Sequence, residues 1–202
     1  REFFEAIEFL KGFDLIDTTY LINDRLQQSH KILAEGAQGS LLDIDFGSYP
    51  FVTSSNTTTP GVCTGLGVAP SKIGKVYGIF KAYCTRVGSG PFPTELFNEE
   101  GERIRAEGRE FGATTGRPRR CGWFDAVAAR YSNMLNGFDE LAITNLDGLD
   151  QLKKIKVCVA YKLNGKRLNV PPAAVEDLEK CEPVYRTLPG WNTPTDQALH
   201  MK

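Results

Sequence analysis

Residues 124–144 read FDAVAARYSNMLNGFDELAIT and contain the two patterns that indicate the fold class. Apolar residues recur on one helical face over 124–135, and the Asn136-Gly137 pair favours the end of a helix there. The apolar run 141–144 predicts a short buried strand. A helix that leads into a buried strand is typical of α/β proteins, in which functional groups gather at the carboxyl ends of the strands.

The same two patterns continue on both sides of this stretch. Strands are expected over 32–34, 76–87 and 155–161. Helices are expected over 1–12, 17–29, 98–110 and 173–180. The Asn164-Gly165 pair predicts a tight turn. We therefore expect an α/β fold with a mostly parallel central sheet flanked by helices, in a single partial domain over residues 1–202.

A long segment without clear periodicity interrupts this alternation. Residues 40–74 are rich in Gly, Ser, Thr and Pro. Loops of this length inside a compact domain are usually functional or disordered. Within it, we expect the carboxylates of Asp43 and Asp45 to be structural and to accept hydrogen bonds from loop N–H groups.

Composition restricts the class of protein. The 202 residues are 41% hydrophobic and 24% charged, which fits a soluble globular protein. The formal net charge is −1, so any anion site must be local, and we expect neither nucleic acid nor a membrane as a partner. The 5 cysteines form no CxxC pair and there are only 2 histidines, so no zinc site is expected. Reduced cysteines are the default in the cytoplasm, where we place the protein.

An arginine-rich loop precedes the helix at 124–135. Residues 114–125 read TTGRPRRCGWFD. Guanidinium groups form bidentate pairs with carboxylate and phosphate, while threonine hydroxyls and a glycine add small donors and allow close backbone approach. This composition predicts a clamp for an anion, and the alternative is a solvated basic turn.

Two further blocks give this loop a context. Residues 35–58 read EGAQGSLLDIDFGSYPFVTSSNTT, and residues 81–95 read KAYCTRVGSGPFPTE. In order and spacing, these blocks and the arginine loop resemble adenylosuccinate synthetases, from about Arg1 to the C-terminal end. The resemblance implies a P-loop NTPase-like synthetase fold and a GTP-dependent ligase of purine (AMP) biosynthesis. Such enzymes transfer the γ-phosphoryl group of GTP to the 6-oxygen of IMP, and L-aspartate then displaces phosphate to give adenylosuccinate. They use Mg²⁺ and act as homodimers.

The resemblance also implies which residues contact IMP. It places Gln38 on the hypoxanthine ring, where an amide can stabilise negative charge developing on the 6-oxygen, and this makes Gln38 the catalytic candidate. From the residues alone, a role for Gln38 within its own turn remains open. The implied IMP-binding residues are Gln38, Leu42, Thr53, Val87 and Arg117.

The arginine loop matches the aspartate-binding loop of the family. The implied aspartate-binding residues are Ala113, Thr114, Thr115, Gly116, Arg117, Pro118 and Arg119. Arg119 also reaches the GTP side, and we expect Arg120 to be structural or solvent-facing. The substrate-binding loops are thereby expected over 40–74 and 109–123.

A third block matches the guanine-recognition segment and comprises Asn145, Leu146 and Asp147. The Asp147 carboxylate can accept hydrogen bonds from the N1–H and 2-amino groups of guanine, which selects GTP over ATP. The family usually has lysine where this chain has Asn145, so the strength of guanine binding is an open question.

Some parts of the family pattern have no counterpart in residues 1–202. No GxxxxGK(S/T) phosphate loop is present, and we expect that loop, the catalytic Asp and His and the Mg²⁺ ligands to lie upstream. We therefore expect an internal or C-terminal fragment that holds no metal and does not catalyse the reaction alone. Two alternatives stay open: a non-catalytic relative that binds purine nucleotides and dicarboxylates, and a fragment whose pockets need the missing segments.

Overall fold

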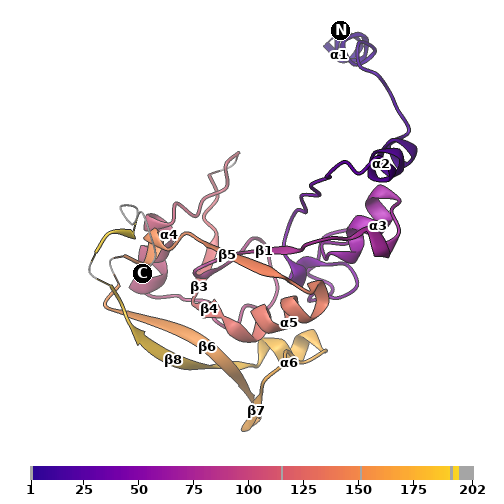
Figure 1. Ribbon diagram of the computed structural model, residues 1–202. Coiled ribbons are helices and arrows are strands. Elements are labelled where there is room, and N and C mark those ends of the chain that lie inside the picture. The colour runs from indigo at the N-terminus through magenta and orange to yellow at the C-terminus, as the bar shows by residue number, and fades with distance from the viewer. Residues whose placement is uncertain (1, 115, 151, 192, 196–202) are drawn as a thin grey trace.

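The computed structural model describes residues 2–114, 116–150, 152–191 and 193–195. Figure 1 shows an α/β body from which the N-terminal helix projects on an extended connection. The α-helices are α1 Glu2–Leu10, α2 Thr18–Gln27, α3 Pro60–Leu66, α4 Glu99–Glu107, α5 Ala126–Asn136 and α6 Val175–Glu179. The strands are β1 Tyr77–Lys81, β2 Cys84–Arg86, β3 Arg120–Gly122, β4 Phe124–Asp125, β5 Glu140–Thr144, β6 Lys154–Leu163, β7 Lys166–Leu168 and β8 Glu182–Pro189. Short 3-10 helices are η1 Ser40–Leu42, η2 Pro70–Lys72 and η3 Asp147–Leu149.

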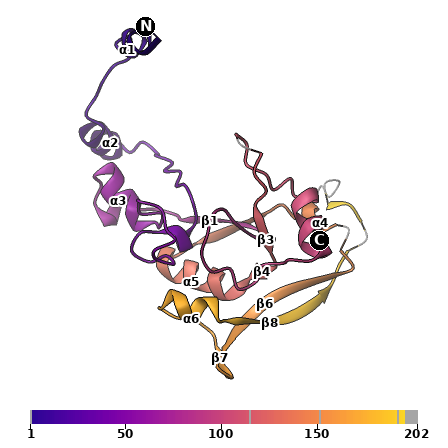
Figure 2. The same ribbon diagram turned by 180° about the vertical axis from the view of Figure 1, so that it is seen from behind.

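The strands pair in three sheets. β1 and β5 are parallel, with Lys81 opposite Thr144 at their carboxyl ends. β2 pairs antiparallel with β3, and β6 pairs parallel with β4 and antiparallel with β7 and β8. Figure 2 shows the long ribbon of β6 and β8 from behind, with α5 and α6 beside it. The α/β class is confirmed, and the described strands share three sheets rather than one.

Two buried clusters form the core. Tyr83 and Trp123 pack with Ile104, Leu149 and neighbouring residues in one cluster. The second contains Val127, Cys158, Tyr161, Leu178 and Cys181 and lies where α5 and α6 meet β6. Among the described residues, no helix combines the length and the apolar character needed to cross a membrane.

The local signals of helix α5 are confirmed at both ends. Asp125 caps its N-terminus by accepting hydrogen bonds from the N–H groups of Val127 and Ala128 at 2.9 and 3.1 Å. Gly137 follows its last residue with φ of 63°, a left-handed conformation that glycine adopts without strain. The turn between β6 and β7 is also confirmed, because Asn164 and Gly165 both have positive φ, at 49° and 79°.

Three strand predictions need correction. The expected strand 76–87 is two strands in different sheets, because the chain turns between them and buries Tyr83 in the core, where it is 2% exposed. Residues 32–34 form no strand, and Leu33 is 89% exposed, since no described strand pairs with them. The strand at 141–144 exists as β5 but is not buried. Leu141 is 58% exposed because β5 pairs with β1 alone among the described strands.

The segment 40–74 is more ordered than its composition predicts, because it contains η1, α3 and η2. Residues 109–123, expected as a loop, end in β3. The helices expected over 98–110 and 173–180 are α4 and α6. Helices α1 and α2 confirm the two N-terminal predictions.

Candidate functional site

A broad, open cleft of about 1540 Å³ lies between the segment after α2, helix α5 and strands β1 and β2. Among the residues that line it are Gln38, Leu42, Val87 and Arg119. These four were expected from the sequence to bind ligands, and they come from distant parts of the chain. Thr53 is not among the lining residues, but it lies next to one of them, because its N–H donates to the Leu42 carbonyl at 2.8 Å.

Gln38 lies at the mouth of this cleft in an unusual backbone conformation. Its φ of 61° is in the left-handed region, which is uncommon for a residue with a Cβ. Its neighbour Gly39 is held by the Thr57 hydroxyl, which donates to the Gly39 carbonyl at 2.9 Å. Backbone strain of this kind concentrates at functional sites, so the geometry is compatible with a ligand-facing amide.

The Asp43 carboxylate organises the loop behind Leu42. Its side chain is fully buried, and it accepts hydrogen bonds from the N–H groups of Asp45 at 2.9 Å and Thr57 at 2.6 Å. Burial on its own would raise the pKa of Asp43, but these backbone hydrogen bonds outweigh it and lower the pKa. The predicted structural role of Asp43 is confirmed. Asp45 also has a structural partner, because it accepts a 2.8 Å hydrogen bond from Asn56.

Asn136 fixes the same loop from the opposite side. Its amide nitrogen donates to the Ser40 hydroxyl at 3.0 Å, and its oxygen accepts from the Thr59 N–H at 2.7 Å. The last residue of α5 thereby ties together two points of the loop that are 19 residues apart in number (59 − 40). The sequence indicated Asn136 only as part of a helix stop, and no local signal reveals its long-range contacts.

Two arginines hold the turn that carries Val87. Arg86 donates to the carbonyls of Phe51 and Ser89 at 2.9 and 3.0 Å. Arg120 donates to Glu95 at 2.8 Å and to the Gly90 carbonyl at 2.9 Å. The structural role expected for Arg120 is confirmed. Val87 itself is 65% exposed at the edge of the cleft.

Backbone hydrogen bonds close the arginine loop, and most of its described residues are exposed. The N–H of Arg119 donates to the Glu110 carbonyl at 2.9 Å, and that of Gly112 donates to the Arg117 carbonyl at 2.8 Å. Five expected aspartate-binding residues are exposed, namely Ala113, Thr114, Gly116, Arg117 and Pro118. Thr115 lies outside the described residues. Among the described residues of this loop, Arg119 alone lines the cleft.

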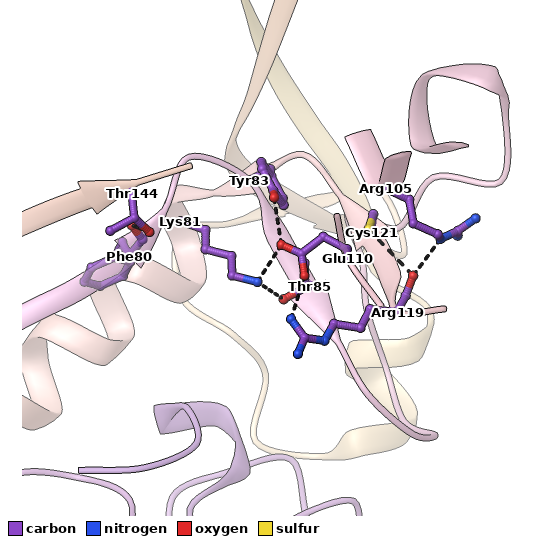
Figure 3. Close-up of polar contacts among 9 residues, drawn as sticks. All are labelled: Phe80, Lys81, Tyr83, Thr85, Arg105, Glu110, Arg119, Cys121 and Thr144. Carbon is purple, nitrogen blue, oxygen red and sulfur yellow. Dashed lines mark hydrogen bonds and ion pairs between the residues drawn. The ribbon is translucent and has the colours of Figure 1, made fainter. Parts of the chain in front are cut away.

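Glu110 receives the side chains at the base of this loop, as Figure 3 shows. Its carboxylate accepts from Lys81 Nζ at 2.6 Å, from the Tyr83 hydroxyl at 2.7 Å and from Arg119 Nη1 at 2.8 Å. Burial would raise the pKa of Glu110, but these three hydrogen bonds outweigh it and lower the pKa. The sequence analysis missed Glu110, Lys81 and Tyr83. The available signal was an acidic residue directly before a basic loop.

The guanine-recognition candidates lie beyond the carboxyl end of β5. Asn145 is half-buried with φ of 57°, while Leu146 and Asp147 are exposed. These three are not among the residues that line the cleft. Of the three, Asn145 contacts Tyr83, one of the lining residues. Burial and then Glu110 raise the pKa of Tyr83, and a hydrogen bond with Asn145 acts in the opposite direction.

Together, the strand pairing and the cleft define an α/β protein whose cleft wall carries the cationic side chains of Lys81 and Arg119. Comparisons with known proteins give the family. The family model for adenylosuccinate synthetase matches residues 1–202, so the chain belongs to the adenylosuccinate synthetase family.

Individual relatives agree with this assignment. Adenylosuccinate synthetase of Parabacteroides distasonis is 59% identical over 192 residues, 95% of this chain and 45% of that protein. The enzyme of Bacteroides fragilis is 59% identical over 193 residues, with 96% and 45% covered. A fully ligated adenylosuccinate synthetase from Plasmodium falciparum is 43% identical and superposes with a TM-score of 0.88 over 91% of this chain and 44% of that one. The fold prediction is thereby confirmed, and the chain spans about 45% of the length of the curated relatives it matches.

Proposed function

We propose that this chain carries substrate-binding residues of an adenylosuccinate synthetase, a GTP-dependent ligase that forms a C–N bond. The observation that supports this most directly is the cleft surface shared by Gln38, Leu42, Val87 and Arg119. The reaction joins L-aspartate to IMP through a 6-phosphoryl intermediate and yields adenylosuccinate, GDP and phosphate.

In this proposal, IMP occupies the part of the cleft near η1. The Gln38 amide donates to the 6-oxygen as negative charge develops there, and Leu42 and Val87 pack against the nucleotide. Thr53 donates its hydroxyl to the IMP phosphate, and Arg117 lies near the ribose. The buried Asp43 carboxylate supports the binding of IMP here, because the hydrogen bonds that it accepts from backbone N–H groups hold the loop rigid and keep the IMP-contacting side chains in place.

L-aspartate binds beside IMP at the loop over residues 113–119. Thr114, Thr115, Arg117 and Arg119 hold its carboxylates, since guanidinium and hydroxyl groups are suitable donors for these acceptors. The exposure of Thr114 and Arg117 at the loop tip is what a loop that closes over its ligand requires.

GTP is the co-substrate, and Asp147 selects its guanine base with help from Asn145 and Leu146. Mg²⁺ supports phosphoryl transfer when it is bound with GTP. Within the described residues, no three His, Cys, Asp or Glu side chains gather to hold a metal ion. The proposal includes a homodimer and a cytoplasmic location, both implied by the family likeness.

Adenylosuccinate formation by the polypeptide that its gene encodes tests this function. Product should appear only when IMP, L-aspartate, GTP and Mg²⁺ are all present. Gln38→Ala should lower kcat on the order of 10²-fold, because it removes a donor to the developing oxyanion. Gln28→Ala, an exposed glutamine after α2, is the matched control and should leave kcat unchanged. IMP binding without product would favour a non-catalytic relative. No binding of IMP would reject both the ligase and the non-catalytic relative.

A further inference from the structure

Glu110 is a buried carboxylate behind the cleft wall to which the family likeness gives no role. It is 1% exposed, so it does not itself meet a ligand. Its three hydrogen-bond donors, Lys81, Tyr83 and Arg119, all line the cleft. Figure 3 shows the Lys81 side chain, from the end of β1, and the Arg119 side chain, from the residue before β3, converging on this one carboxylate.

The charges in this cluster do not cancel. Two cations, Lys81 and Arg119, meet the single negative charge of Glu110. Their side chains are 29% and 33% exposed, so both remain open to solvent on the cleft side. Thr85, another lining residue, adds a hydroxyl 3.4 Å from Lys81 Nζ. A local excess of one positive charge beside a hydroxyl suits an incoming anionic group.

The backbone under Arg119 is held independently. Its N–H donates to the Glu110 carbonyl at 2.9 Å, and its carbonyl accepts from Arg105 Nε at 2.8 Å. With the backbone fixed, the ion pair with Glu110 determines where the guanidinium points. A guanidinium that is already ordered loses less conformational freedom when it binds a carboxylate.

We propose that Glu110 is a positioning residue, which holds Lys81 and Arg119 together at the cleft wall so that both cations receive one carboxylate of the dicarboxylate substrate. Lys81 thereby becomes a substrate-binding residue. The identity of that substrate as L-aspartate rests on the proposed function. The pairing of the two cations at the cleft wall, and their affinity for an anion, do not depend on the proposed function.

Steady-state kinetics of the gene-encoded polypeptide give the first test. Glu110→Gln and Lys81→Met should each raise the KM for L-aspartate about tenfold and leave the KM for IMP within about twofold, a selective change that general loss of structure does not produce. The matched control is Glu100→Gln, since Glu100 pairs with Lys156 at 3.8 Å and neither residue lines the cleft. It should leave the KM for aspartate within about twofold. Equal rises in both KM values, or no rise for aspartate, would overturn the proposal.

A chemical-protection measurement gives a second test that needs no activity. Succinate, a dicarboxylate without an amino group, should slow acetylation of Lys81 by acetic anhydride, as followed by mass spectrometry. Lys11, which pairs with Glu8 at 2.7 Å and does not line the cleft, should react at the same rate with and without succinate. Glu110→Gln should abolish the protection of Lys81.

The two measurements separate this proposal from the proposed function. Protection of Lys81 in a polypeptide that makes no adenylosuccinate keeps the paired cations and rejects the ligase. Product formation without protection overturns the role of Lys81 and Glu110 and keeps the ligase. If Lys81 is not protected and no adenylosuccinate forms, the paired-cation site and the ligase are both rejected.

Discussion

The Tyr161 hydroxyl donates a 2.5 Å hydrogen bond to Asp125 Oδ2 between β6 and the start of α5. Asp125 is 5% exposed, and its other oxygen caps α5. Burial raises the pKa of Asp125, and the hydrogen bond from Tyr161 partly offsets that rise. The pair therefore joins the second core cluster to the helix that supports the cleft.

Tyr161→Phe should destabilise the chain by about 1–3 kcal/mol at neutral pH, because it leaves a buried carboxylate with one partner fewer. The pKa of Asp125 is raised in the folded state, so its contribution to stability is present below the unfolded pKa and is lost as pH rises through the folded pKa. Tyr161→Phe raises the pKa of Asp125 further, because it removes a hydrogen bond to the ionised carboxylate. The loss of unfolding free energy caused by the substitution should therefore grow with pH. Urea unfolding at acidic and neutral pH measures this, with the exposed Tyr20→Phe as control. A cost that is constant with pH would contradict the assignment.

Asp43→Asn should also destabilise the chain, by on the order of 3 kcal/mol at neutral pH, because the amide keeps one acceptor oxygen and turns its NH2 group toward N–H donors at the other position, those of Asp45 and Phe46 or those of Thr57 and Thr58. The folded pKa of Asp43 is lowered, so its stabilisation is present above the unfolded pKa and is lost as pH falls through the folded pKa. The difference between wild type and variant should therefore shrink below about pH 4. Asp45→Asn is the matched control for urea unfolding and should cost little, because the Asp45 carboxylate is exposed and accepts its 2.8 Å hydrogen bond from the Asn56 side chain at the surface. Equal costs at positions 43 and 45 would show that the buried hydrogen bonds do not set stability.

Features set by neighbouring residues could be predicted from the sequence. The end of α5 follows from Asn136-Gly137, and the β6–β7 turn follows from Asn164-Gly165, because both depend on which residues tolerate positive φ. The anion clamp that the sequence predicts at the arginine loop rests on side-chain chemistry alone and stays a prediction.

Features set by distant contacts could not be predicted. The break between β1 and β2 arises because Tyr83 is buried with Trp123, 40 positions later in the chain (123 − 83). Glu110 belonged by its pattern to the end of a helix, and only the fold brings Lys81 and Arg119 to it. The strand expected at 32–34 shows the converse, because apolar residues form a strand only where another strand offers partners for their backbone groups.

Asn145 combines a left-handed backbone conformation with a position that the family likeness assigns to guanine binding. Its φ of 57° favours asparagine or glycine over residues that avoid the left-handed region. Asn145→Ala should therefore be less stable than Asn145→Gly by about 1 kcal/mol in urea unfolding, since both lose the amide and only alanine is strained. Asn145→Lys should carry a similar strain and yet bind GTP more tightly, because a lysine stem can lie across the purine face. A larger thermal shift with GTP than wild type, together with lower stability without ligand, is the expected result. Lower stability without tighter GTP binding would mean that position 145 serves the backbone alone and that guanine recognition lies with Asp147.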